Sequence, residues 1–124
     1  MTATVAVVED NPDNRLLVRA LLEDEYDIVE YETGVDALDG FGSSRPNLVL
    51  LDISLPGMDG TEVLRRMRAE PALSRIPVVA LTAHAMSGDR ERFLAEGFDD
   101  YVTKPIVDET VLFDAIRRLL AESG

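Results

Sequence analysis

Residues 48–60 read LVLLDISLPGMDG, and this stretch decides the predicted fold. Four apolar residues run directly into an acid, Asp52, and a Pro-Gly turn and the start of a helix follow. An uninterrupted apolar run of this length is typical of a strand buried on both faces of a parallel sheet. Asp52 is then a carboxylate at the carboxyl end of a buried strand, which is the edge where open α/β sheets bind ligands.

The composition excludes several classes of function. The chain has 124 residues, enough for one domain with one core, and its lack of cysteine excludes disulfides, thiolate zinc sites and cysteine nucleophiles. A net charge of −12 argues against nucleic-acid binding. No signal peptide stands at Met1, and no apolar run approaches the roughly 18 residues of a membrane span. We therefore expect a cytoplasmic protein that does not bind membranes.

Strand-like and helix-like patterns alternate five times along the chain. Strands are predicted at 4–9, 27–31, 48–52, 76–82 and 98–102. Helices are predicted from 12 to about 23, over 34–42, between the N-cap Asp59 and Pro71, over 87–96 and from about 108. This alternation predicts an α/β fold, a parallel sheet with helices on both faces. We expect a single domain over residues 1–124, because no linker interrupts it and too little chain follows the fifth helix for an output domain.

Polar residues mark the ends of four of the five predicted strands. Glu9 and Asp10 end the first strand, and Asp52 ends the third. Thr82 ends the fourth strand, and Lys104 follows the fifth. The carboxyl ends of parallel strands lie at one edge of the sheet, so these residues are predicted to meet in one pocket. Lys104 is the only lysine of the chain, and its ammonium is a compact point charge, unlike the planar guanidinium of the eleven arginines.

These side chains predict a metal-assisted phosphoryl transfer. Three carboxylates packed together repel one another, and a divalent cation relieves the repulsion. Oxygen-only ligands favour a hard ion, so we expect Mg²⁺, for which Mn²⁺ could substitute, with Asp10 and Asp52 as direct ligands and Glu9 acting through water. A hydroxyl, a lysine and Mg²⁺ around a carboxylate are the groups that stabilise a phosphoryl group during transfer. Asp52 is the predicted nucleophile, and its product is an acyl phosphate.

Four motifs in order resemble the receiver domains of two-component response regulators, the CheY-like superfamily: VVED at 7–10, LLDISLPGMDG at 50–60, ALTA at 80–83 and KP at 104–105. The resemblance covers essentially the whole chain and is to stand-alone regulators of the DivK type. It implies a doubly wound, flavodoxin-like (βα)5 fold with the sheet order 2-1-3-4-5. It also implies a phosphohistidine donor on a histidine kinase or phosphotransfer protein, and a downstream protein target. Such a regulator catalyses its own phosphorylation and slow dephosphorylation and is not a turnover enzyme.

The resemblance implies roles for the residues of the pocket. Asp52 corresponds to the phosphoacceptor, and Lys104 to the family's lysine. Glu9 and Asp10 correspond to the acidic pair of the metal site, and the backbone carbonyl of Ser54 to the third protein ligand. Many members have Asp-Asp where this chain has Glu-Asp, a common variant that leaves the interpretation intact.

The resemblance also implies a switch. Thr82 corresponds to the hydroxyl that bonds the phosphoryl group, and the amide of Ala83 to a donor for another phosphoryl oxygen. Tyr101 corresponds to an aromatic that turns inward when Thr82 moves, although a tyrosine in a short edge strand is also often simply packed. The bond between Lys104 and Pro105 is usually cis in the family. The chain is expected to be a monomer, or a phosphorylation-dependent dimer through the fourth helix, fifth strand and fifth helix.

The first helix carries more apolar residues than one face can bury, with Leu16, Leu17 and Ala20 as candidates for exposure. This is either ordinary core on a wide face or a docking face for a four-helix-bundle phosphodonor. The family docks its phosphodonor beside the pocket. The predicted docking residues are Asn14, Leu17, Pro105 and Ile106.

Two residues beyond the pocket are expected to tune its chemistry. Ser54 and His84 lie two residues past Asp52 and Thr82, and we hypothesise that they control how readily water reaches the acyl phosphate. His84, the only histidine, is expected to be a solvated side chain and not itself a phosphorylated residue.

Three alternative functions use the same residues. A haloacid-dehalogenase-type phosphatase needs a second Asp two residues after the nucleophile as general acid–base, and this position is Ser54. A scaffold pseudo-receiver usually lacks the phosphoacceptor or the lysine, and both are present. A receiver excised from a hybrid histidine kinase or a larger regulator stays open, although Met1 and the short tail after Leu120 favour a natural single domain.

Overall fold

The computed structural model describes residues 2–83, 89–104, 106 and 108–123, and these residues form a five-stranded parallel sheet. The sheet order is β2-β1-β3-β4-β5, so the predicted topology is confirmed. The strands are β1 (Thr4–Val8), β2 (Asp27–Tyr31), β3 (Leu48–Asp52), β4 (Val78–Thr82) and β5 (Asp100–Thr103).

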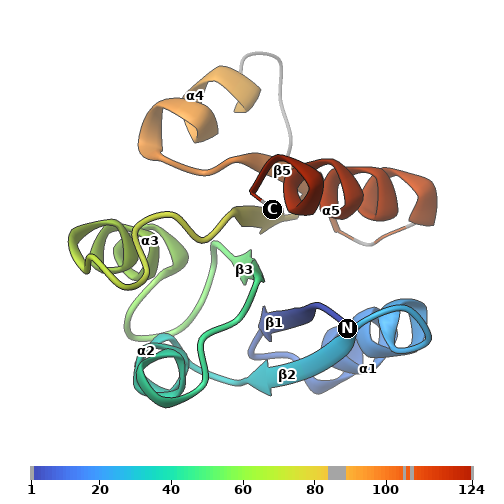
Figure 1. Cartoon of the computed structure of the whole chain (residues 1–124), viewed down its shortest axis with the longest axis horizontal. Helices are drawn as coiled ribbons and strands as arrows, with labels where there is room; N and C mark the ends of the chain where they lie inside the picture. The colour runs from blue at the N-terminus through green and yellow to red at the C-terminus, as the bar shows by residue number, and fades with distance from the viewer. Residues whose placement is uncertain (1, 84–88, 105, 107, 124) are drawn as a thin grey trace.

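In the described part of the chain, five helices cover the two faces of the sheet (Figure 1). They are α1 (Pro12–Leu22), α2 (Gly34–Ser43), α3 (Gly60–Ala69), α4 (Asp89–Glu96) and α5 (Glu109–Ser123). On one face, α1 and α5 pack with Leu22 and Ile116 in the core, and on the other, α2, α3 and α4 contribute Phe41, Met67 and Phe93. None of the helices within the described residues is both long enough and apolar enough to span a bilayer.

The central strand β3 is buried along its whole length, whereas β2 forms a partly exposed edge. The first four side chains of β3 are apolar and the fifth is Asp52. Helices on both faces of the sheet exclude water from the strand. The parallel register sets Asp52 opposite Leu81 of β4 and Thr82 opposite Thr103 of β5. The register therefore brings the polar strand ends to one edge of the sheet.

Two strands begin or end inside their predicted limits. The first ends one residue before the predicted 4–9, although the Glu9 amide still donates to the last carbonyl of β2 at 3.0 Å. The fourth begins at Val78 because Pro77 has no N–H to donate to a ladder. The amide of Ile76 instead closes a turn onto a carbonyl three residues earlier.

The fifth strand is shifted from the predicted 98–102 to begin at Asp100. The preceding residues are used to end α4, where Gly97 takes a φ of +113° and the Phe98 amide donates to the Phe93 carbonyl at 3.0 Å. This six-to-one bond is the Schellman arrangement that satisfies the last carbonyls of a helix. The first two residues of the predicted helix 87–96 lie outside the described residues.

Candidate functional site

Acidic side chains gather at the carboxyl edge of β1 and β3. One carboxylate oxygen from each of Glu9, Asp10 and Asp52 lies within 4.8 Å of the others. Glu9 and Asp52 are only 1% and 2% exposed, whereas Asp10 is exposed. The cluster therefore consists of two buried acids with a third acid at its solvent side.

Lys104 reaches into this cluster from the end of β5. Its Nζ lies 2.8 Å from Oε1 of Glu9 and 3.1 Å from Oδ2 of Asp52, and its main-chain amide donates to the carbonyl of Thr82 at 2.7 Å. Burial by itself would lower the pKa of Lys104, but the hydrogen bonds and charges of Glu9 and Asp52 outweigh burial and raise the pKa above its usual value. Lys104 thus stays a cation and offsets the repulsion between the two buried acids.

The turn after β3 folds back against Asp52. The amide of Ser54 donates to Oδ1 of Asp52 at 3.0 Å, so each carboxylate oxygen of Asp52 has a donor. Gly57 takes a φ of +74°, which glycine adopts without strain. A Cβ added to Gly60 would lie 2.4 Å from the carbonyl oxygen of Asp52, so only glycine lets α3 start this close to the strand end.

Both carboxylate oxygens of Glu9 accept hydrogen bonds from α1 and its N-cap. Nδ2 of Asn14 donates to Oε1 at 3.1 Å, and the amide of Asn11 donates to Oε2 at 3.3 Å. Since Lys104 also bonds Oε1, Glu9 has little remaining capacity to bind a cation directly. Asp10, at the solvent side of the cluster, has more capacity to bind a cation directly.

The predicted docking residues that are described border this cluster. A hollow of about 10 Å³ beside it is lined in part by Asn14, Leu17 and Ile106. Leu16 and Leu17 are 65% and 40% exposed, so the excess apolar residues of α1 lie on its surface and not in the core. Pro105 lies outside the described residues.

The remaining predicted residues lie along β4 and β5. Thr82 is 8% exposed at the end of β4, and Ala83 after it is exposed. Tyr101 is partly buried on β5, and its ring lies 5.4 Å from that of Phe93 at an angle of 45°. Such a contact is the packing expected of a core aromatic. His84 lies outside the described residues.

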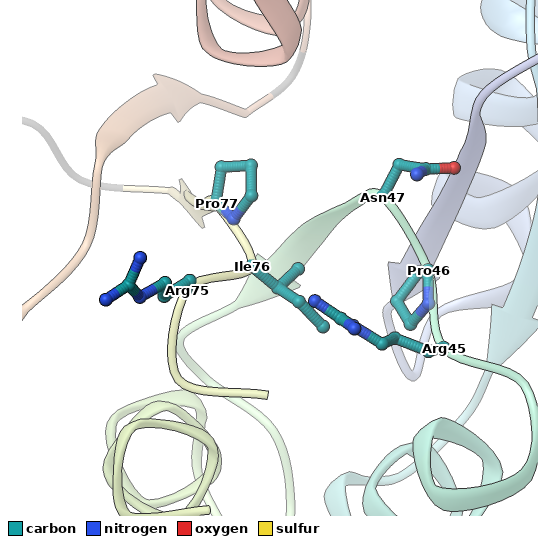
Figure 2. Close-up of a pocket in the computed structure, with 6 residues that line it drawn as sticks. All are labelled: Arg45, Pro46, Asn47, Arg75, Ile76 and Pro77. Atoms are coloured by element: carbon teal, nitrogen blue, oxygen red, sulfur yellow. The ribbon is translucent and has the colours of Figure 1, made fainter. Parts of the chain in front are cut away.

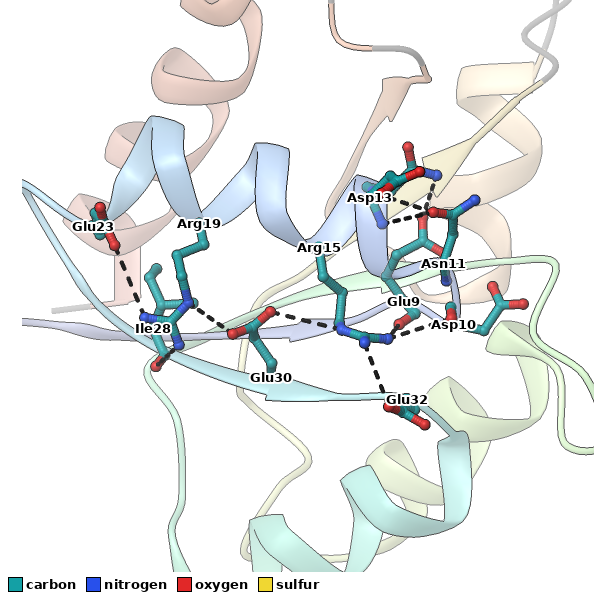
Figure 3. Close-up of polar contacts among 11 residues, drawn as sticks. Glu9, Asp10, Asn11, Asp13, Arg15, Arg19, Glu23, Ile28, Glu30 and Glu32 are labelled. Carbon is teal, nitrogen blue, oxygen red and sulfur yellow. Dashed lines mark hydrogen bonds and ion pairs between the residues drawn. The ribbon is translucent and has the colours of Figure 1, made fainter.

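Sequence reasoning missed the contact that Arg15 makes with the acidic pair. Its Nη1 donates to the main-chain carbonyl of Glu9 at 2.7 Å and to that of Asp10 at 3.3 Å (Figure 3). Arginine is common on helix surfaces, and nothing in the sequence distinguishes this one from its neighbours. Only the crossing of α1 over the end of β1 brings the guanidinium to these carbonyls.

A larger cavity lies at the opposite edge of the sheet and contains none of these residues. It has a volume of about 420 Å³ and is formed by the segments that lead into β3 and β4 (Figure 2). Its lining residues are Arg45, Pro46, Asn47, Arg75, Ile76 and Pro77. This cavity therefore lies far from the carboxylates, and its size alone does not make it the functional site.

The donor set of the acidic cluster suits a hard divalent cation. All the acidic ligands offer oxygen, the donor that Mg²⁺ prefers. Three carboxylates and one ammonium leave two negative charges uncompensated within the cluster, which a divalent ion would balance. The residues present thus fit such an ion.

These features define the class of the protein. The chain belongs to the response regulator receiver domain family, whose model matches residues 5–117. Receiver domains are regulatory domains of two-component systems and hold Mg²⁺ in an acidic pocket. The predicted family membership is confirmed.

Two curated relatives show where such a domain occurs. The chain is 42% identical over 107 residues to the polar-differentiation response regulator DivK of Brucella ovis, a match that covers 86% of this chain and 87% of DivK. It is 47% identical over 106 residues to the sensor protein GacS of Pseudomonas syringae, a match that covers 82% of this chain. The chain spans only 12% of the length of GacS.

Solved structures with the same fold include other receivers. The receiver domain of the sensor histidine kinase PA1611 from Pseudomonas aeruginosa has a TM-score of 0.87 at 33% identity, over 98% of this chain and 99% of that one. That structure is described with a magnesium ion coordinated in its active-site cleft. A response regulator from Chloroflexus aurantiacus has a TM-score of 0.90 at 24% identity, over 98% and 99% of the two chains, and shows the fold alone.

Proposed function

We propose that this chain accepts a phosphoryl group on Asp52 from a phosphohistidine in a Mg²⁺-dependent reaction, and that phosphorylation switches the binding of a downstream protein. The observation that carries the proposal is the position of Asp52. Its carboxylate ends the central strand and lies 3.1 Å from Lys104, within an acidic cluster that suits a divalent cation.

In the proposed reaction, a carboxylate oxygen of Asp52 attacks phosphorus while the bond from phosphorus to the histidine nitrogen breaks. The electron pair of that bond stays on the imidazole, which takes up a proton, and an aspartyl phosphate forms. Mg²⁺, when bound, would neutralise charge on the phosphoryl oxygens and the acids. Lys104 supplies a second positive charge, and the hydroxyl of Thr82 and amide of Ala83 donate to phosphoryl oxygens.

We assign the cation to Asp10, Asp52 and the carbonyl of Ser54, with Glu9 acting through water. The hydrogen bonds that already occupy Glu9 support its indirect role. Mn²⁺ would fit the same oxygen donors.

The proposed switch links Thr82 to Tyr101. Movement of the Thr82 hydroxyl towards the phosphoryl group would vacate space beneath β5, into which the ring of Tyr101 could turn. Tyr101 packs on Phe93 of α4, so its movement would alter the face formed by α4, β5 and α5, which we propose as the pairing face of a phosphorylation-dependent dimer. The phosphodonor would dock on Asn14, Leu17 and Ile106, together with Pro105.

The phosphodonor is proposed to be a histidine kinase or a histidine phosphotransfer protein, and the site of action the cytoplasm, where the ATP that charges such kinases is available. Coverage of 87% of DivK supports a stand-alone regulator, and the GacS match supports a receiver segment of a hybrid kinase. Both use the same phosphoryl chemistry. The presence of Asp52 and Lys104 argues against a pseudo-receiver, and Ser54 argues against an efficient phosphatase.

The decisive experiment incubates the protein with phosphoramidate and Mg²⁺ and measures the gain of one phosphoryl group by intact-protein mass spectrometry. The wild type and Asp39→Asn, a variant of an exposed acid on α2, should be labelled equally, and Asp52→Asn should not be labelled. Equal labelling of Asp52→Asn would overturn the proposal.

Dephosphorylation half-lives of Ser54→Ala and His84→Ala test whether these residues tune the access of water to the acyl phosphate. Unchanged half-lives would reject that role.

A further inference from the structure

The guanidinium of Arg15 lies against the main chain of the acidic pair and not against its carboxylates. Nη1 donates to the carbonyl of Glu9 at 2.7 Å and to the carbonyl of Asp10 at 3.3 Å. The side chain of Arg15 is only 14% exposed, although it comes from the helix α1. Figure 3 shows it extending from α1 to Glu9 and Asp10 on one side and to Glu30 and Glu32 on the other.

Acidic residues at the end of β2 hold Arg15 in this position. Its Nε lies 3.7 Å from Oε1 of Glu30, and its Nη2 lies 3.4 Å from Oε1 of Glu32. Glu30 also pairs with Arg19, one turn further along α1, at 2.7 Å (Figure 3). The charge of Arg15 is thus compensated by two glutamates outside the acidic cluster, and its planar guanidinium is held by these glutamates and by the two carbonyls.

The contact of Arg15 lies between the last backbone hydrogen bond of β1 and the start of α1. The amide of Glu9 makes the last backbone bond from β1 to β2, at 3.0 Å, and α1 begins at Pro12. Three carbonyls lie between these elements: the guanidinium of Arg15 bonds those of Glu9 and Asp10, and the main-chain amide of Arg15 donates to that of Asn11 at 3.1 Å. Because consecutive planar peptide units share a Cα, holding their carbonyls restricts the backbone dihedrals at that Cα, and with them the direction in which the side chains of Glu9 and Asp10 leave the main chain.

We propose that Arg15 is a positioning residue for the cation site, which orients the acidic pair towards Asp52 by holding its backbone. The inference rests on the proposed function, since it assumes that this cluster binds Mg²⁺. Outer residues that orient metal ligands typically contribute 10- to 100-fold to metal affinity. Arg15 acts on the ligands through their carbonyls, so we expect about a tenfold effect.

The sign of the effect separates positioning from simple electrostatics. Arg15 is a cation close to a site for another cation, so its charge alone disfavours Mg²⁺. Replacing it with a neutral side chain would tighten Mg²⁺ binding if charge were the whole effect. It would weaken binding if Arg15 acts by orienting the acidic pair.

The test measures Mg²⁺ dissociation constants by titration of the ¹⁵N-labelled protein, followed through the amide shifts of Asp52 and Ser54. Arg15→Met should raise the dissociation constant about tenfold. The matched control is Arg19→Met, which breaks an ion pair to the same Glu30 but contacts neither carbonyl of the acidic pair. The control should bind Mg²⁺ as the wild type does, and both variants should lose thermal stability in EDTA.

Several results would overturn the inference. Unchanged or tighter binding by Arg15→Met would show that its charge or its packing is all that matters. Equal weakening in Arg19→Met would show that only the general attachment of α1 to β2 is involved. Failure of the wild type to bind Mg²⁺ would refute the proposed function and this role with it, whereas wild-type binding that Arg15→Met retains would refute this role alone.

A second variant keeps the test decisive if Arg15→Met does not fold. Arg15→Lys retains the charge, but an ammonium lacks the planar fork that spans the two carbonyls and the glutamates. A rise in its Mg²⁺ dissociation constant in the same direction would support positioning. An unchanged constant would reject it, because the planar fork that bonds the two carbonyls would then have no part in Mg²⁺ binding.

Discussion

Replacing Lys104 with methionine should destabilise the protein in the absence of divalent cations. The substitution keeps an unbranched side chain of similar length and removes the ammonium that lies 2.8 Å from Glu9 and 3.1 Å from Asp52. Both carboxylates are almost fully buried, so they would face each other without a counter-charge. The loss should appear as a lower free energy of unfolding in EDTA.

The magnitude follows from how buried the three groups are. Removing one partner of a fully buried ion pair costs about 3–5 kcal/mol, and removing one from an exposed pair costs about 0–1 kcal/mol. Lys104 retains 17% of its side-chain exposure, and the cluster opens to solvent at Asp10. An intermediate loss of about 2 kcal/mol is therefore expected. Mg²⁺ at 100 times its dissociation constant adds about 2.7 kcal/mol to the stability of the variant, enough to offset the loss.

The assay is urea unfolding followed by far-ultraviolet circular dichroism, because the chain has no tryptophan. The matched control is Arg117→Met, which removes a surface ion pair to Glu25 and should change stability by less than about 1 kcal/mol. If Lys104→Met proves as stable as the wild type in EDTA, or if the stability of the variant does not rise when Mg²⁺ is added, the reasoning about the buried acids is refuted.

The same variant has a defined pH dependence. The pKa of Lys104 is raised above 10.5, since the bonds and charges of Glu9 and Asp52 outweigh burial, so its stabilising contribution is present below that pH. The contribution is lost as pH rises through the higher pKa of the folded state. The gap in stability between wild type and Lys104→Met should therefore close in strongly alkaline solution.

Three further predictions concern the scaffold. Gly60→Ala should cost about 1–3 kcal/mol by overpacking against the carbonyl at the end of β3, whereas Gly42→Ala, with open space around it, should be neutral or stabilising in the same urea assay. Burial and a neighbouring acid raise the pKa of Tyr26, so Tyr26→Phe should lessen the fall in stability as pH rises past 10, which urea midpoints at several pH values would check. The hydroxyl and amide of Thr110 lower the pKa of Asp108, and Thr110→Val should raise that pKa in a ¹³C carboxyl titration.

Hydrophobic pattern alone predicted the elements whose side chains are buried. The central strand was predicted residue for residue as 48–52, because apolar residues on both of its faces leave one interpretation. The predicted limits of two strands were wrong where backbone hydrogen bonding decides them. Pro77 has no N–H to donate to a ladder, and the amide of Phe98 is used to close α4. These are choices between competing backbone partners, which a hydrophobic pattern does not encode.

The contacts of the candidate site likewise divide into those that the sequence predicts and those that it does not. The sequence predicts that one pocket holds Glu9, Asp10, Asp52 and Lys104, because the carboxyl ends of parallel strands lie at one edge of the sheet whatever their separation along the chain. The contacts of Arg15 could not, since they depend on the angle at which α1 crosses the end of β1. That angle is set by packing against the core and has no local signature.

The sheet order also predicts that the two sides of the pocket differ in how readily they unfold locally. The acids lie on or beside β1 and β3, and β3 is enclosed by strands on both sides and helices on both faces, so its amide protons should exchange with solvent only through global unfolding. Lys104 follows β5, an edge strand paired on one side only, where exchange proceeds through small local openings. Deuterium uptake should therefore distinguish a rigid half of the pocket that carries Asp52 from a looser half that carries Lys104.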